Sequence, residues 1–154
     1  MAYIRETILA AMATSAAGIT IANGYESTVY AVTRYPTEQE DDVVAQHYIL
    51  GTPFLFLFDG DPEDVDGMQK DDNAMWVLRP KLRGIIGSNV TNPSTVLNSL
   101  IGDVKKWIAA NRDSWHASVE STYVRQITIL ASLTKPHAGF DASLEVRYET
   151  TATY

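Results

Sequence analysis

The sequence contains no cysteine. This absence excludes disulfide bonds, a thiol nucleophile and thiolate metal ligands, and a reducing compartment is the easiest fit for the chain. The sequence also has no run long and apolar enough to span a bilayer, so we expect no membrane partner. Hydrophobic residues make up 45% of the 154 residues, which fits a single domain, residues 1–154, with a full-sized core.

The short motifs of common catalytic chemistry are absent as well. We find no G-x-S-x-G nucleophile elbow, no P-loop and no G-x-G-x-x-G fingerprint, and the three histidines have no metal-ligand spacing. An EF-hand loop counted from Asp59 fails because its sixth residue is Asp64 and its twelfth is Lys70. We therefore expect no catalytic residue, cofactor or metal, and we predict that the protein is not an enzyme. A small hydrolase stays an open hypothesis, ranked below the two functions described at the end of this section. It stays open because an active site can be assembled from residues far apart in the sequence without a short motif.

Positive charge is scarce, since 12 basic residues face 19 acidic ones and the formal charge is −7. This balance opposes broad binding to phosphate backbones, which needs clustered lysine and arginine. The acidic residues crowd between positions 36 and 72, where only Lys70 is basic. They are Glu38, Glu40, Asp41, Asp42, Asp59, Asp61, Glu63, Asp64, Asp66, Asp71 and Asp72. That window carries −10 and the remainder +3. We predict two acidic loops, at about 36–50 and 59–73, on a slightly basic body.

Residues 91–111 form the clearest amphipathic helix. Its apolar residues recur at steps of three and four, and they are Val96, Leu97, Leu100, Ile101, Val104, Trp107 and Ile108. Asp103, Lys105 and Lys106 fall on the opposite face. Asn92 is placed to cap the first turn, and Pro93 at the first helical position loses no useful N–H. An apolar surface must cover the helix, and strands on either side are the natural candidates.

The remaining elements follow from apolar periodicity and turn signals. We predict a helix at 3–17 and strands at 25–35, 53–58, 74–88, 119–133 and 140–148, with a loose tail at about 150–154. The third strand contains Pro80, where we expect a bulge or an edge. The continuous apolar run at 53–58 suits a strand covered on both faces or lying partly in a subunit contact. Strict alternation at 140–148 predicts one buried face and one wet face, with Leu144 pointing inward.

The predicted fold class is α+β. We expect a small, mostly antiparallel or mixed sheet with two helices packed on it, in the order α-β-β-β-α-β-β.

Several phrases resemble those of the tail terminator, or tail-completion, proteins of long-tailed bacteriophages. They cover nearly the whole chain, about residues 4–148, and are ITIANGY at 19–25, PFLFLFDG at 53–60, MW at 75–76, LNSLIGDV at 97–104 and FDASLEVRY at 140–148. The resemblance implies a small sheet with two helices and a structural role in the virion, at the tail or neck, after assembly in the host cytoplasm.

The role that the resemblance implies is a ring, of six copies in this family, on the head-proximal end of the tail tube. Such a ring stops tube polymerisation, contacts the tail tube protein and the head–tail connector protein, and lets DNA pass through its lumen without specific binding. A lumen for DNA should be neutral or negative, so the acidic loop with Asp61, Glu63, Asp64 and Asp66 either lines the lumen or faces a partner. Basic residues that suit an acidic neighbour in the ring are Lys81, Arg83 and Arg125.

Two alternative functions stay open at this stage, beside the small hydrolase. Other head–tail neck proteins and minor tail proteins share the same patterns. A non-viral acidic binding module for a cationic partner is the second, and it predicts a monomer whose acidic loops order when ligand is added.

Overall fold

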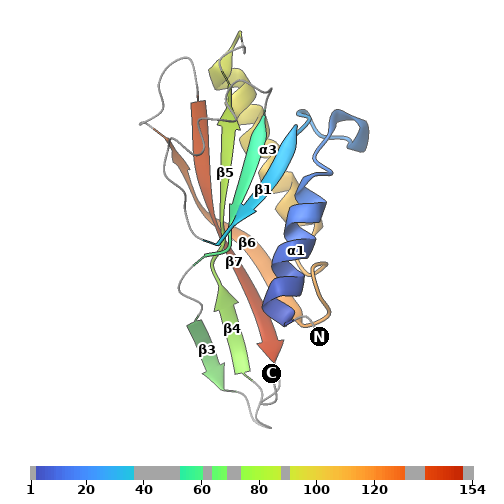
Figure 1. Ribbon diagram of the computed structural model, residues 1–154, viewed down its shortest axis with the longest axis vertical. Coiled ribbons are helices and arrows are strands. Elements are labelled where there is room, and N and C mark those ends of the chain that lie inside the picture. Colours follow the sequence, from blue (N-terminus) through green and yellow to red (C-terminus); the bar gives the residue numbers. More distant parts are fainter. Residues whose placement is uncertain are drawn as a thin grey trace.

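In the computed structural model, the described residues form one mixed β-sheet, and helices α1 (Ile4–Ala16) and α3 (Pro93–Ala110) pack against one face of it (Figure 1). The structure describes residues 3–36, 53–60, 64–68, 74–87, 91–130 and 138–150. This arrangement confirms the predicted α+β class, with two helices packed on a sheet.

The sheet has seven strands in the described part of the chain. They are β1 (Ala31–Tyr35), β2 (Phe54–Phe58), β3 (Asp64–Met68), β4 (Ala74–Leu78), β5 (Lys81–Ile86), β6 (Val119–Ile129) and β7 (Ala138–Thr150). Their order is β1-β2-β5-β7-β4-β3, and β6 pairs with β7 on its other side. Only β1 and β2 are parallel among these pairs.

The long strand predicted at 74–88 is broken at its proline. Strand β4 ends at Leu78 and β5 begins at Lys81, and both pair with the same long strand β7. Pro80 has no N–H to donate, but its carbonyl accepts a hydrogen bond from the Leu144 N–H at 2.9 Å. The predicted interruption at Pro80 is confirmed, and the strand expected at 74–88 is two strands, β4 and β5.

Strand β3 corrects the prediction of one acidic loop at 59–73. Residues Asp64–Met68 pair antiparallel with β4, so part of that segment is a strand at the edge of the sheet. This strand was missed in the sequence because acidic composition is typical of loops, and it outweighed the short alternation of polar and apolar residues at the start of β3. The predicted loop at 36–50 lies, apart from Pro36, outside the described residues.

Helix α3 confirms the predicted apolar face, with two exceptions. Its buried residues are Leu97, Leu100, Ile101, Asp103, Val104, Trp107 and Ile108. Val96 is only partly buried, and Asp103, predicted on the wet face, is 3% exposed. Pro93 does begin the helix, but the side chain of Asn92 makes no capping hydrogen bond.

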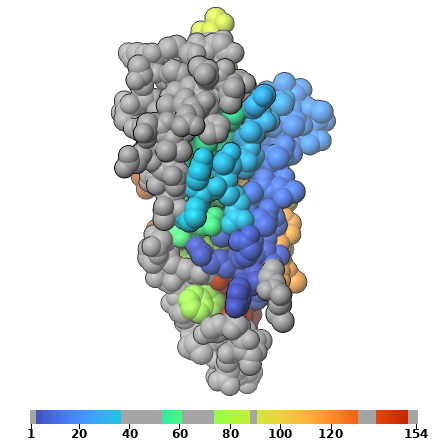
Figure 2. All heavy atoms as spheres, viewed as in Figure 1, coloured from blue at the N-terminus to red at the C-terminus, as the bar shows by residue number. Residues whose placement is uncertain are grey.

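The burial of Asp103 also explains why the strand predicted at 25–35 is shorter than expected. The Asp103 carboxylate accepts hydrogen bonds from the backbone N–H groups of Glu26 at 3.0 Å and Ser27 at 2.8 Å. These N–H groups are therefore used by a side chain of α3 and not by a neighbouring strand. Regular pairing begins only at Ala31, in register with Phe54. Figure 2 shows β1 beside α1 along one face of the molecule.

Strand β2 is buried along its whole length, which confirms the prediction of a strand covered on both faces. Leu55 and Leu57 join the main core beneath the helices. Phe54, Phe56 and Phe58 pack with Ile85 on the opposite face, where Tyr35 and Leu130 lie against them.

Strand β7 corrects two further predictions. Leu144 and its alternating partners do enter the main core, but the polar face is not wet, because Asp141 and Glu145 are buried. Thr150, predicted in a loose tail, is a buried residue of β7 that accepts a hydrogen bond from the indole N–H of Trp76 at 2.9 Å. Residues 151–154 lie outside the described residues.

Candidate assembly interface

The acidic residues singled out in the sequence fall in two classes. Asp61 and Glu63 lie outside the described residues, whereas Asp64 and Asp66 belong to β3. The pairing register of β3 with β4 shifts between Val65 and Gly67, so Asp66 is the extra residue of a β-bulge. Within the described chain β3 pairs only with β4, which places both aspartates on an edge strand.

The basic residues singled out in the sequence are Lys81, Arg83 and Arg125, and Arg83 forms a buried ion pair within the subunit. Its side chain lies in β5 and is only 6% exposed. The guanidinium donates hydrogen bonds to both carboxylate oxygens of Asp141, at 2.7 and 3.0 Å, and lies over the ring of Phe58 at 5.3 Å. Lys81 approaches the same carboxylate at 3.7 Å and is partly exposed. In this conformation Arg83 faces Asp141 and Phe58, whereas Lys81 is more accessible.

Arg125 belongs to a second ionic cluster on the polar face of β7. The buried carboxylate of Glu145 lies 3.4 Å from Arg147, 3.7 Å from Arg125 and 3.8 Å from Arg79. The side chain of Arg125 is 52% exposed, so its contact with Glu145 leaves much of its guanidinium facing solvent. Paired charges explain how β7 buries acidic residues on the face that the sequence predicted to be wet.

An open groove of about 540 Å³ lies between the C-terminal half of α3 and β6. It is lined by Lys105, Ile108, Ala109, Arg112, Thr122, Tyr123, Val124, Arg125, Gln126 and Ile127. We call it the basic groove, because its three charged residues, Lys105, Arg112 and Arg125, are all exposed cations. Sequence reasoning missed Lys105 and Arg112 as site residues, because helix and strand come together only in the folded chain.

Strand β6 forms the edge of the sheet beside this groove. It is 11 residues long and pairs only with β7 among the described strands. Most of its residues from Tyr123 onward are exposed. The register with β7 shifts between Val124 and Gln126, so Arg125 is the extra residue of a bulge. A long edge strand presents backbone groups that another chain can pair with, and bulges and charges interrupt that pairing.

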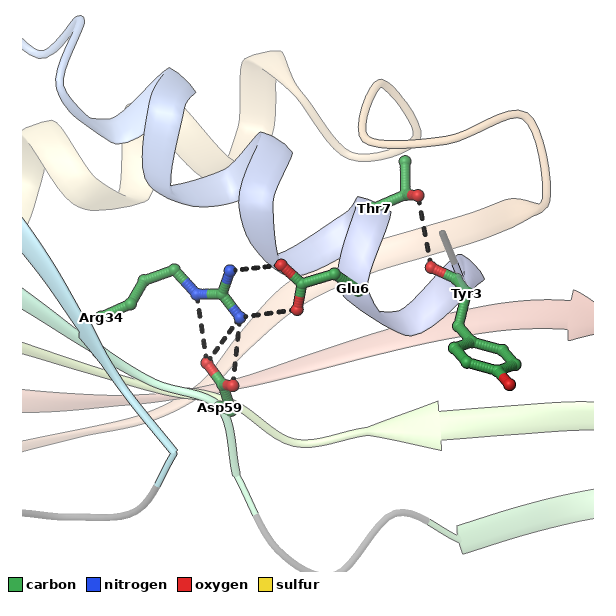
Figure 3. A network of polar contacts seen from close by, with 5 residues as sticks. All are labelled: Tyr3, Glu6, Thr7, Arg34 and Asp59. Carbon is green, nitrogen blue, oxygen red and sulfur yellow. Dashed lines mark hydrogen bonds and ion pairs between the residues drawn. The ribbon is translucent and has the colours of Figure 1, made fainter. Parts of the chain in front are cut away.

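A separate polar network ties α1 to the sheet (Figure 3). Arg34 of β1 donates to both carboxylate oxygens of Glu6, at 2.9 and 3.2 Å, and to both oxygens of Asp59, at 3.1 Å from its Nη2. Glu6 comes from the first turn of α1, and Asp59 follows the end of β2. The hydrogen bonds from Arg34, and then its charge, hold the pKa of Glu6 below its usual value.

We predict that Arg34→Gln raises the pKa of Glu6 towards the ordinary value for glutamate. Because the folded pKa lies below the unfolded one, the contact contributes stability at pH values above the ordinary pKa and loses it as the pH falls through the lowered value. A side-chain NMR titration of Glu6 measures the change, with Arg112→Gln as the matched control. An unchanged Glu6 titration in Arg34→Gln contradicts the prediction.

Among the described residues, no three histidine or acidic side chains gather in a way that holds a metal ion. The described helices are all too short or too polar to cross a membrane. No protein-family model and no curated protein sequence matches the chain.

Proposed function

We propose that the protein is a structural virion protein of the tail-terminator type. In this role it forms a ring on the tail tube, stops tube polymerisation and joins the tail to the head connector, while DNA passes through the lumen. The role is not enzymatic and uses no cofactor.

The phrases that resemble the phage tail terminators support this proposal, together with the fold. The resemblance implies a small sheet with two helices, and α1 and α3 lie on one face of a mixed sheet. A fold of this class hosts many functions, so the fold alone carries little of the argument.

The observation that carries the proposal is that β6 and β3, two of the three edge strands among the described strands, differ in chemistry; the third edge strand is β1. On one side β6 lies beside the basic groove, and on the other β3 contains Asp64 and Asp66. A closed ring requires two different, complementary surfaces on each subunit, because each copy contacts its neighbours head to tail. Unlike edges meet that requirement, whereas a symmetric dimer needs one self-complementary patch.

The experiment that tests the proposal is sedimentation velocity over a wide concentration range, with negative-stain images of any large species. We expect a species the size of a hexamer that appears as a ring, either in free solution or on tail tubes of the same particle. A protein that stays monomeric at every concentration and does not bind such tubes contradicts the proposal.

A binding module for a cationic partner is the second candidate. It is favoured by the acidic crowding between residues 36 and 72, where the charge is −10. This candidate predicts a monomer that binds basic peptides with an affinity that falls as salt is added. Other neck proteins and minor tail proteins predict the same self-assembly as a terminator but a different position in the particle.

A further inference from the structure

We infer that the basic groove between α3 and β6 receives the acidic edge strand β3 of a second copy of this chain. The inference rests on the proposed ring and identifies the two surfaces that would meet in it. Each subunit would offer its groove to one neighbour and its β3 to the other, which is the heterologous contact that closes into a ring.

Charge complementarity is the first reason to place β3 in this groove. Lys105, Arg112 and Arg125 line the groove and are exposed. The segment from 59 to 73, which contains β3, has seven acidic residues and one lysine. A subunit with a net charge of −7 repels its copies overall, and contacts where opposite charges meet offset that repulsion.

The second reason is the position of two bulges. Two edge strands have charged residues at bulges, Asp66 in β3 and Arg125 in β6, and a second bulge of β6 contains Glu120. A bulge leaves its extra residue outside the regular ladder. The structure therefore places opposite charges at irregular points of the two edges that a head-to-tail contact brings together.

The bulges also limit the kind of contact that we infer. A continuous ladder between β6 and an incoming strand would be interrupted at Arg125 and at the shift between Val119 and Ser121. Contact through the groove avoids this problem. Its lining combines the apolar residues Ile108, Ala109, Val124 and Ile127 with the three cations. Apolar contact provides affinity, and the charges fix which edge can enter.

The test uses two variants with reversed charges. The first, Lys105→Glu/Arg112→Glu, makes the groove acidic while Asp64 and Asp66 stay unchanged. The second, Asp64→Lys/Asp66→Lys, makes β3 basic while the groove stays unchanged. Each variant alone brings like charges together at every contact of a ring. We expect each to need at least about tenfold higher concentration than the wild type for half-assembly, measured by sedimentation velocity.

An equimolar mixture of the two variants provides the decisive result. The acidic groove of the first variant then faces the basic β3 of the second, and the unchanged groove of the second faces the unchanged β3 of the first. Every contact in an alternating ring is complementary again, and a ring of six has the even number that alternation requires. We expect the mixture to assemble at about the wild-type concentration, which also shows that both variants are folded.

Matched single substitutions control for the change in net charge. Lys106 is exposed on α3 beside Lys105 but does not line the groove. Its ammonium donates to the Gly24 carbonyl at 2.7 Å and lies 5.1 Å from the centre of the Tyr25 ring, so thermal unfolding of this control is measured beside its assembly. We expect Lys105→Glu to weaken assembly and Lys106→Glu to leave it within about twofold of the wild type. Glu26→Lys, at an exposed position outside β3, is the corresponding control for the acidic edge.

The possible outcomes separate this inference from the proposed function. If the wild type forms rings and both charge-reversed variants form them equally well, the inferred interface is wrong and the ring stands. If rings form normally but Asp64→Lys/Asp66→Lys slows DNA passage, the acidic strand faces the lumen and the inference is overturned. Impaired variants that the mixture does not restore also overturn it. If the wild-type protein never assembles, alone or on tail tubes, the result contradicts both the proposed function and this inference.

Discussion

Leu144→Asp is expected to abolish soluble, folded protein. Leu144 is 1% exposed and belongs to the main core beneath the two helices. The substitution removes a buried leucine, which costs about 2–5 kcal/mol, and places a carboxylate where it has no partner, which costs several kcal/mol more. The sum approaches the whole stability of a typical domain, about 5–15 kcal/mol.

The measurement is the soluble fraction after expression, followed by thermal unfolding monitored by circular dichroism. Ser143→Asp is the matched control, because it introduces the same side chain at the neighbouring position on the other face of β7, opposite Lys81. We expect this control to fold and to lose no more than about 1–2 kcal/mol. A cooperative transition near the wild-type temperature in Leu144→Asp would contradict the inward orientation of this residue.

Asp103→Leu is the second large effect that we expect. Both side chains have four heavy atoms and branch at Cγ, so the substitution keeps the skeleton and removes the acceptor for the backbone N–H groups of Glu26 and Ser27. Hydrogen bonds to a charged group contribute about 1.5–3 kcal/mol each, so for two bonds we expect a loss of about 3–6 kcal/mol in the free energy of unfolding. Asp103→Asn keeps one oxygen acceptor and should lose about half as much.

Urea unfolding measures the loss, and hydrogen exchange at Glu26 and Ser27 shows where it arises. Both amides should exchange faster in Asp103→Leu than in the wild type at conditions where each protein stays folded. Asp113→Leu, at an exposed position in the turn after α3, serves as control and should change stability by no more than about 0.5 kcal/mol. Wild-type stability in Asp103→Leu would show that the two N–H groups have other partners.

Several features of the fold were predictable from local sequence. The apolar face of α3 follows from spacing along one helix, and the break between β4 and β5 follows from the missing N–H of Pro80. The burial of β2 on both faces follows from five consecutive apolar residues. In each case the cause lies within the element itself or within one residue, so neighbours in space do not need to be known.

The errors at Asp103 and Asp141 concern polar residues whose partners come from elsewhere in the chain. Asp103 looked solvent-exposed on a helical wheel, and it is buried because backbone N–H groups about 76 residues away point at it. Asp141 looked wet in the alternation of β7, and it is buried because Arg83 lies beside it in β5. The sequence pattern reports polarity, and polarity alone does not distinguish a solvated charge from a paired one.

The sequence by itself determined the α+β class, the positions of the helices and most strands, and the separation of acidic residues from a slightly basic remainder. Only the tertiary structure decided where those charges lie. It brought Lys105 of α3, Arg112 of the turn after it and Arg125 of β6 to one groove, and it placed Asp66 on the edge strand β3. The reason is that periodicity arises from contacts within one element, whereas a groove or a sheet edge arises when elements distant in the chain pack together.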